Sequence, residues 1–508
     1  MTRPSRPAPD NSPEGILQAQ RNAAKRIVLF TVFLDILGFG IIIPQLGVYA
    51  SQFAASPLEI GCLAAAYSTM QFLCAPLWGR LSDRIGRRPV LLWSIFGTAI
   101  GYVCFAFANS LPWLFAARII DGITGGNIST AQAYLSDLTT PEERSKTFGI
   151  FGAIFGIGFA LGPMIGSLLS HLPGIWGTNF GIGVFTAGLS LLNWALGIKR
   201  LPETLNPDDR AANIKRDADS GRKWEIINVH GFSRALALPG LNRLIVVSLF
   251  GMIAFATLQG TYTVFLIKQF VRPAVQQAIL ANPASSAQSA QTRFPHAGDV
   301  NFITQQVGSI NAPFDPQFGG DFAPPIPQSG PLNWREVEKI LVAPQAARLT
   351  GWIFTTIGII SLIVQGGLIG PLKRRFGELN LILIGSVIMA AALMLVPTPQ
   401  VIWLEFPVMA ILALGNGISG PVITSLVSQL APDAERGEIL GVFQSVQSLG
   451  RIIGPLLGGA LFNYISASAP YFAGGAIMFA SAIMAYGLRH MPEIHRIAAA
   501  AEPARAKS

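Results

Sequence analysis

The sequence has 508 residues, of which 51% are hydrophobic and only 12% carry a charge. Apolar runs long enough to cross a bilayer recur along it, which excludes a soluble globular domain and predicts an all-α polytopic membrane protein. The net charge of +9 does not predict nucleic-acid binding, because the basic residues gather in short loops between the apolar runs. The composition therefore predicts that the protein is embedded in a lipid bilayer.

The chain begins with a polar segment, 1–26, that is rich in proline and lacks the apolar core and cleavage site of a secretory signal. We predict a disordered cytoplasmic tail there. The three cysteines, Cys62, Cys74 and Cys104, all fall in predicted spans, and they predict neither a disulfide nor a metal cluster.

Twelve membrane spans follow from the length and spacing of the apolar runs. An N-terminal bundle of six spans over 27–200 is separated by a cytoplasmic linker, 201–240, from a C-terminal bundle over 241–490, and 491–508 is a second cytoplasmic tail. A surface helix is expected in the linker near Trp224–Leu236. The predicted spans are 27–50, 58–78, 89–109, 112–136, 147–170, 176–198, 241–267, 346–370, 379–397, 402–430, 437–464 and 468–488.

The connection Gly79–Pro89, Gly-Arg-Leu-Ser-Asp-Arg-Ile-Gly-Arg-Arg-Pro, is short and strongly basic. Short loops rich in Lys and Arg stay in the cytoplasm, and the other basic loops alternate with loops that lack Lys and Arg. Both termini are therefore predicted to be cytoplasmic. By itself the loop is an ordinary basic connection. Its spacing resembles the loop signature of the major facilitator superfamily, which implies a part in a conformational gate with the candidates Gly79, Asp83, Arg84, Gly86, Arg87 and Arg88.

A pattern of glycines and one proline occurs in predicted span 5 and again, at a constant offset, in predicted span 11. Small residues at this spacing let helix backbones approach closely in lipid, and a proline permits a bend. The pattern favours a gating role during conformational change, with ordinary tight packing as the alternative. Its candidate residues are Gly158, Gly162, Pro163 and Gly166 in the first copy and Gly450, Gly454, Pro455 and Gly458 in the second.

Together the basic loop and the duplication resemble the major facilitator superfamily, and the span-5 pattern resembles its drug/proton antiporter branch. Leu34–Pro44, Arg118–Gly126 and Leu201–Leu205 are similar to the corresponding segments of the tetracycline-efflux proteins in that branch. The resemblance implies two pseudo-symmetric six-helix halves with the substrate site between them. One departure is Gly101, which stands where the tetracycline exporters carry an acidic residue, so tetracycline itself is not an expected substrate.

Two further gating contacts are implied by the resemblance. Asp137 would pair with Arg87, and Asp83 would meet the start of span 11, although by itself Asp137 is a solvated helix end. The second copy of the basic loop has Arg374 where the first has Asp83, so a gating role is not expected in that half.

Charged residues inside spans are expensive and are functional candidates by default. Arg118 and Asp121 lie three residues apart on one helix face and can pair, and Asp35 lies at a similar depth in span 1. We assign proton coupling to Asp35 and Asp121, with Arg118 acting on their protonation. The alternative is a permanent Arg118–Asp121 structural pair, with Asp35 capping a kink. Arg451 can bond a carbonyl, or it can face the cavity and hold an anion.

Neutral polar residues inside spans complete the candidate substrate cavity. Each of them can instead form a hydrogen bond between helices, which is the commoner use of such residues. Together with Arg451, these candidates are Asn127, Gln132, Gln259, Gln365, Asn416, Gln444 and Gln447.

The segment 270–345 is an extracytoplasmic insertion between spans 7 and 8, rich in Pro, Ala and Gln and without a long apolar run. It cannot cross the membrane. A lid over the cavity is one interpretation, but an inert or partly disordered excursion is favoured. A short helix is expected from Trp334 to Leu349.

Three functional classes compete. The favoured class is a secondary active transporter, a monomer in the cytoplasmic membrane of a prokaryote, that exports small amphipathic compounds by alternating access. An uptake transporter for a sugar, organic acid or other metabolite is the alternative. A membrane enzyme is not expected, because the five histidines fall in loops or at span ends and form no catalytic or metal constellation. Without a phosphate-binding loop, the expected energy source is a proton gradient and not a cofactor.

Overall fold

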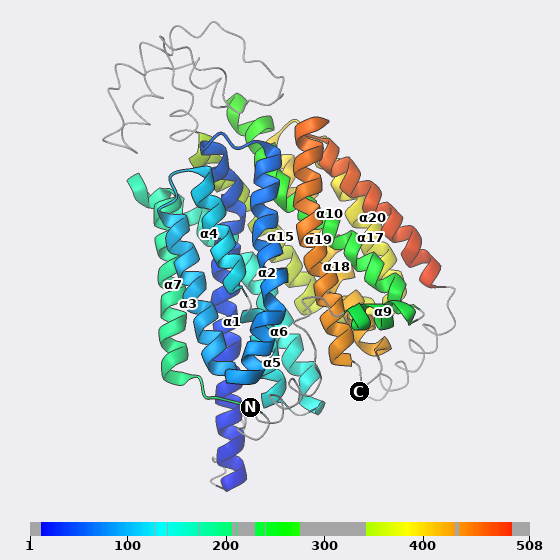
Figure 1. The fold of residues 1–508 in the computed structure, drawn as a ribbon. Helices are drawn as coiled ribbons and strands as arrows, with labels where there is room; N and C mark the ends of the chain where they lie inside the picture. The colour runs from blue at the N-terminus through cyan, green and yellow to red at the C-terminus, as the bar shows by residue number, and fades with distance from the viewer. Residues whose placement is uncertain are drawn as a thin grey trace, which may run out of the picture.

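The computed structural model describes residues 12–125, 127–139, 141–170, 172–205, 210, 229–238, 240–274, 342–431 and 436–489. These residues form helices and connections and no strand. The central part of the expected insertion, the linker from 211 to 228 and the C-terminal tail lie outside the described residues. Figure 1 shows the first half of the chain, in blue to teal, beside the second half, in green to red.

The first half begins with α1 (Pro13–Gln52) and ends with α7 (Asn179–Arg200). Between them lie α2 (Pro57–Ile85), α3 (Arg87–Ala106), α4 (Leu111–Thr124), α5 (Asn127–Leu138), α6 (Pro141–Leu169) and the 3-10 turn η1 (Gly174–Gly177). The second half comprises α9 (Val229–Ala237), α10 (Leu241–Leu266), the π-helical turn η2 (Ile267–Val271), α15 (Ala343–Ile363), the π-helical turn η4 (Val364–Leu368), α16 (Ile369–Phe376), α17 (Glu378–Leu395), η5 (Ile402–Leu404), α18 (Glu405–Leu430), α19 (Arg436–Tyr464) and α20 (Ala469–Leu488).

Every predicted span coincides with one helix or with consecutive helical pieces. Within the described residues, 9 helices are long and apolar enough to cross a membrane. The nearly all-helical architecture is therefore confirmed, whereas the count of twelve spans fits it and stays a prediction. Many large apolar side chains face outward, among them Trp93 and Trp403, which are 64% and 70% exposed. Such exposure is the expected state of a lipid-facing surface.

Two sequence predictions are corrected at the level of single helices, and a third is tested in part. Helix α1 begins at Pro13, so 13–26 is helical and not disordered, because its Ala, Leu, Gln and Arg residues favour continuation of the span. Predicted span 4 is divided between α4 and α5, since the Gly125–Gly126 pair weakens the helix at mid-span. The linker helix α9 ends near the expected Leu236, but its described part starts at Val229.

The repeated glycine pattern produces the same contact in both halves. A Cβ on Gly162 in α6 would lie 2.6 Å from the carbonyl carbon of Gly40 in α1. A Cβ on Gly454 in α19 would lie 2.7 Å from the Cβ of Ala256 in α10. Because only glycine permits these approaches, spans 5 and 11 each press against the first span of their own half. The glycine pattern repeated in the sequence thus produces an equivalent helix–helix contact in each half.

The two halves meet largely through α6 and α19, on the faces of these helices that do not pack on α1 and α10. We call the end of the molecule that carries the Gly79–Pro89 loop the basic end, and the opposite end the far end. Near the far end, a Cβ on Gly459 of α19 would lie 2.6 Å from the carbonyl oxygen of Pro57 in α2. A Cβ on Gly351 of α15 would lie 2.9 Å from the carbonyl oxygen of Pro163 in α6. The halves are therefore in backbone contact there.

Hydrogen bonds reinforce the contact between the halves at the far end. The Gln45 side chain donates to the Ala347 carbonyl over 3.3 Å, and the Ser167 hydroxyl donates to the Arg348 carbonyl over 3.1 Å. The Thr263 hydroxyl donates to the Pro44 carbonyl over 3.2 Å. Toward the basic end, by contrast, Gly79, Gly366, Gly370 and Gly441 have no described atom within 4 Å of an added Cβ. The described structure is closed at the far end and open beside these glycines.

We expect Gly162→Val to lower the melting temperature of the purified protein, because the new side chain would overlap the α1 backbone at Gly40. Overpacking of this kind costs about 1–3 kcal/mol. The matched control is Gly188→Val in α7, an exposed position with nothing within 4 Å of an added Cβ. Thermal unfolding in one detergent would compare the two variants. Equal melting temperatures would contradict close α1–α6 packing.

Candidate functional site

A buried ion pair lies in the middle of the first half. Arg118 and Asp121 sit one turn apart on α4, and the Arg118 Nη1 to Asp121 Oδ2 distance is 2.7 Å. Each residue is only 3% exposed. The i, i+3 spacing read from the sequence places both side chains on one helix face, as expected. The two central charges of α4 therefore neutralise each other in the described structure.

Tyr67 of α2 links this pair to its surroundings. The Arg118 guanidinium carbon lies 4.4 Å from the centroid of the Tyr67 ring, a cation–π geometry. Gln71, one turn along α2, donates to the Tyr67 hydroxyl over 3.1 Å and to the Gly125 carbonyl over 3.0 Å. Gln71 thereby bonds the backbone where span 4 is interrupted. Sequence reasoning missed Tyr67, because a tyrosine within an apolar run is ordinarily a packing residue.

Asp35 belongs to the same neighbourhood as the ion pair. It is half-buried on α1, and its carboxylate acts electrostatically on the hydroxyls of Tyr67 and Tyr102, as Asp121 does. The structure therefore brings the two expected proton-coupling carboxylates to the same pair of tyrosines. Gly101 of α3 packs directly on Asp121, since an added Cβ would lie 2.9 Å from the Asp121 Cβ. The absence of an acidic side chain at Gly101 is what permits this contact.

The remaining cavity candidates are spread over several helices. Gln132 lies on α5, Gln259 on α10, Gln365 in η4 and Asn416 on α18, and all four are partly exposed. Within the part of the chain that the structure describes, none of their amides makes a hydrogen bond, so the interhelical alternative is not realised there. Gln444 is exposed on α19, and Gln447 and Arg451 are half-buried on the same helix. The side chain of Asn127 lies outside the described residues.

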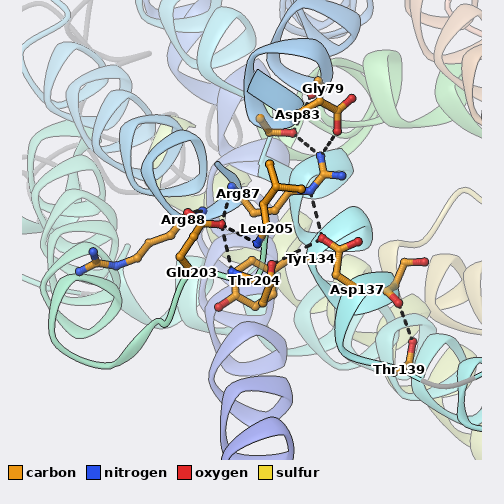
Figure 2. Close-up of polar contacts among 12 residues, drawn as sticks. Gly79, Asp83, Arg87, Arg88, Tyr134, Asp137, Thr139, Glu203, Thr204 and Leu205 are labelled. Atoms are coloured by element: carbon orange, nitrogen blue, oxygen red, sulfur yellow. Dashed lines mark hydrogen bonds and ion pairs between the residues drawn. The ribbon is translucent and has the colours of Figure 1, made fainter. Parts of the chain in front are cut away.

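Arg87 is the centre of a second polar cluster, at the basic end (Figure 2). Its Nη1 lies 2.5 Å from Asp83 Oδ1 and 2.7 Å from the Ser82 hydroxyl, and its Nε lies 3.2 Å from Asp137 Oδ2. The contact between Arg87 and Asp137 that the resemblance implied is present. Burial raises the pKa of the Asp137 carboxyl, and the Arg87 charge partly offsets that rise. Arg87 thus joins the ends of α2, α3 and α5.

Glu203, just after α7, caps the start of α3 in the same view. Its two carboxylate oxygens accept the backbone N–H groups of Arg87 over 2.9 Å and Arg88 over 3.1 Å. Gly86 adopts a φ of 111°, and an added Cβ there would collide with the Glu203 carboxylate. The carboxylate meets the unpaired N–H groups and the positive end of the helix dipole. Sequence reasoning identified the Leu201–Leu205 segment but not this role of Glu203.

The other candidates in the basic loop also make polar contacts. The partner of Asp83 among the described side chains is Arg87, and the start of α19, its expected contact, has its side chains outside the described residues. The Arg84 carbonyl accepts a hydrogen bond from Arg210 of the linker. Arg88 donates to the Ile198 carbonyl over 2.8 Å.

The second basic loop repeats the ion pair with its signs exchanged. Gly377 has a φ of 76° and is followed at once by Glu378, just as Gly86 is followed by Arg87. Lys373 Nζ lies 2.5 Å from Glu378 Oε1, and Glu378 is only 7% exposed. The substitution of Arg374 for the aspartate therefore does not leave this loop without an ion pair.

A buried carboxyl group at the start of α18 was also missed by sequence reasoning. Glu405 is 0% exposed, and its Oε2 accepts a hydrogen bond from the Tyr262 hydroxyl over 3.0 Å. Its Oε1 has no hydrogen-bond partner among the described residues. The position was overlooked because a glutamate at a predicted span boundary is ordinarily a solvated helix end.

Two repeated helical halves of membrane length, with an ion pair buried inside one of them, define a membrane transporter. The family model described as the Major Facilitator Superfamily matches residues 28–287 and 323–507. The chain therefore belongs to the Major Facilitator Superfamily.

Individual relatives agree with this assignment. The chain is 30% identical over 449 residues to the class C tetracycline resistance protein of Escherichia coli, covering 87% of this chain and 90% of the relative. Its fold is similar to that of the human organic anion transporter MFSD10, with a TM-score of 0.56 at 21% identity, covering 92% of this chain and 99% of the other. It is also similar to the nucleoside transporter NupG, with a TM-score of 0.58 at 14% identity, covering 92% and 98%. The family to which the sequence pointed is thus confirmed.

We expect a double-mutant cycle of Arg87→Ala and Asp137→Ala to give a favourable coupling energy of about 0.5–1 kcal/mol, because both side chains remain partly exposed. Thermal or denaturant unfolding would measure it. The coupling should weaken at high salt. Arg87→Ala combined with Glu59→Ala, at the far end of α2, is the control pair and should be additive. A coupling energy of zero would show that the Arg87–Asp137 contact does not stabilise the protein.

Tyr262→Phe should destabilise the protein by about 1–3 kcal/mol, since it removes the hydrogen bond that the described residues make to the fully buried carboxyl group of Glu405. Adding Glu405→Leu to this variant should restore much of the loss, because the stranded polar group is then gone. Tyr464→Phe, at a residue 73% exposed, is the control and should leave unfolding unchanged. A Tyr262→Phe variant as stable as the native protein would refute the importance of this bond.

Proposed function

We propose that this transporter is a proton-coupled exporter of small amphipathic compounds that works by alternating access. The observation that carries the proposal is the Arg118–Asp121 pair, which is 3% exposed at both residues and lies beside Tyr67. Charges buried in a membrane-spanning bundle are expensive and mark ion or substrate pathways. The relatives named for tetracycline resistance support export over uptake.

Proton coupling is assigned to Asp121 and Asp35. Protonation of Asp121 removes its attraction for Arg118, so proton binding and the geometry of the pair are linked. Asp35 acts on the same two tyrosines, Tyr67 and Tyr102, and therefore responds to the same change. A substrate that enters this region competes with the proton for one set of groups, which is the requirement of antiport.

Alternating access is supported by the unequal contacts at the two ends. The halves touch at the far end through Gly459 and Pro57 and through Gly351 and Pro163, whereas Gly441 at the basic end has open space beside it. With the basic loops in the cytoplasm, this conformation faces inward. Rocking of the halves would separate the far end and close the basic end. The energy source is the proton gradient, and we place the monomer in the cytoplasmic membrane with both termini inside.

Proteoliposomes with an imposed inside-acid gradient test the proposal. Native protein should accumulate a fluorescent amphipathic compound while protons leave the lumen, and Asp121→Asn and Asp35→Asn should both abolish this coupled movement, because neither retains a carboxyl that can exchange a proton. Glu59→Gln is the matched control, since it makes the same chemical change at an exposed cap and keeps the capping hydrogen bonds possible.

Two results would contradict the proposal. Accumulation that ignores the gradient would show that transport is not proton-coupled. Coupled accumulation that survives both substitutions would place the proton on other groups. Movement of a metabolite in the same direction as the protons, out of the acidic lumen, would instead favour a proton-coupled uptake transporter.

A further inference from the structure

Arg451 is a charged residue near the middle of α19 in the second half, and its surroundings differ from those of Arg118. It lies near the middle of α19, half-buried, and its Nη2 donates to the hydroxyl of Ser448 on the same helix over 2.7 Å. No carboxylate of the described residues lies within ion-pair distance of it. Arg118 has Asp121, whereas Arg451 has no counter-charge among the described residues.

A guanidinium within the bundle destabilises the protein unless an anion or further hydrogen-bond acceptors bind to it. A guanidinium within a membrane-spanning bundle ordinarily pairs with an acid or lines a wet cavity. One intrahelical hydrogen bond to Ser448 leaves most of the five donor N–H groups of Arg451 available. Arg451 as a whole is partly exposed, so the described residues do not enclose it completely.

The packing of α19 shows where Arg451 points. Gly454 packs on α10, whereas Pro455 and Gly459 pack on α2 at Gly61 and Pro57. Pro455, one turn after Arg451, packs its ring on Gly260 of α10 and its carbonyl on Gly61 of α2, so this part of α19 lies between α10 and α2. There it acts electrostatically on Tyr67. Arg451 therefore stands at the boundary between the halves.

The neighbours of Arg451 suit an anion. Gln447, one turn away, makes no side-chain hydrogen bond among the described residues, so its amide N–H groups can be donated to an anion. Tyr67 of α2 interacts electrostatically with Arg451, and the centroid of its ring lies 4.4 Å from the Arg118 guanidinium carbon. A planar guanidinium with an amide one helical turn away is a typical receptor for a carboxylate or sulfonate.

We propose that Arg451 binds the anionic group of the exported compound, with Gln447 and Tyr67 beside it, so that the substrates are amphipathic organic anions. The proposal rests on the proposed function and specifies the substrate class of the same site. An anion held by α19 and bordered by Tyr67 of α2 contacts both halves at once. Because the Tyr67 ring also contacts Arg118, occupancy at Arg451 is transmitted to the Arg118–Asp121 pair.

Equilibrium binding to the purified protein tests the proposal without any gradient. The probes are three aryl acids, 1-naphthoate, 4-butylbenzoate and 1-naphthalenesulfonate, each compared with its neutral amide by calorimetric titration. Native protein should bind at least one acid about tenfold to a hundredfold more tightly than its amide, the range expected for hydrogen bonds to a charged group. Arg451→Gln should abolish that preference, and Arg451→Lys should retain part of it.

Arg243→Gln is the control, because it removes the same charge from an exposed position at the start of α10 and should leave the preference intact. Thermal unfolding separates binding from a structural role. If Arg451 serves an anion, the ligand-free Arg451→Gln protein should be at least as stable as the native protein, since an uncompensated buried charge is removed. A lower melting temperature would instead assign Arg451 to the framework.

The proposal is overturned if no acid binds better than its amide, or if Arg451→Gln retains the preference. Failure of the proton-coupling model gives a different pattern. Acid binding that depends on Arg451, together with transport that ignores the gradient, would refute only the coupling. Gradient-driven transport of uncharged or cationic compounds, without preference for acids, would refute only the anion site.

Discussion

Backbone contact along α6 and α19 is the constraint on which the rest of the structure depends. Each of these helices uses glycine to press against the first helix of its own half, α1 or α10, and uses its other face to meet a helix of the opposite half, α15 or α2. In lipid the hydrophobic effect does not drive helices together, so the van der Waals packing at these close approaches stabilises their association. Much of the contact between the halves therefore involves α6 and α19, and α1 adds contacts with α10 and α15. Arg451 lies on one of these helices, α19.

Polar groups in the bundle are arranged by depth. At the basic end, the cluster around Arg87 is partly exposed, so its electrostatic energy is modest and its main effect is to hold helix ends together. In the interior, Arg118 and Asp121 are almost fully buried and depend on each other. The Lys373–Glu378 pair shows that pairing survives when the signs are exchanged, because attraction depends on opposite charges and not on which residue carries which.

Much of the fold followed from local pattern. Hydrophobic periodicity located the helices, and the repeated glycines, represented by Gly162 and Gly454, predicted the two equivalent halves. The i, i+3 spacing of Arg118 and Asp121 predicted their pairing, since a helix fixes that geometry by itself. The site was predicted less completely. Tyr67 and Glu405 looked like packing and boundary residues, because their importance lies in which distant helix each one meets. The extension of α1 to Pro13 was missed because its polar composition resembles a tail.

The sequence by itself determined the membrane class, the positions of the helices, the duplication and the resemblance that the family assignment confirmed. These properties are encoded in the spacing of residues within single helices and in the charges of short loops. Only the tertiary structure decided that Arg451 interacts electrostatically with Tyr67, that Glu203 caps α3 and that the halves touch at the far end. Those contacts join residues far apart in the chain, and the rotation of one helix about its axis relative to another is set by packing that no local period records.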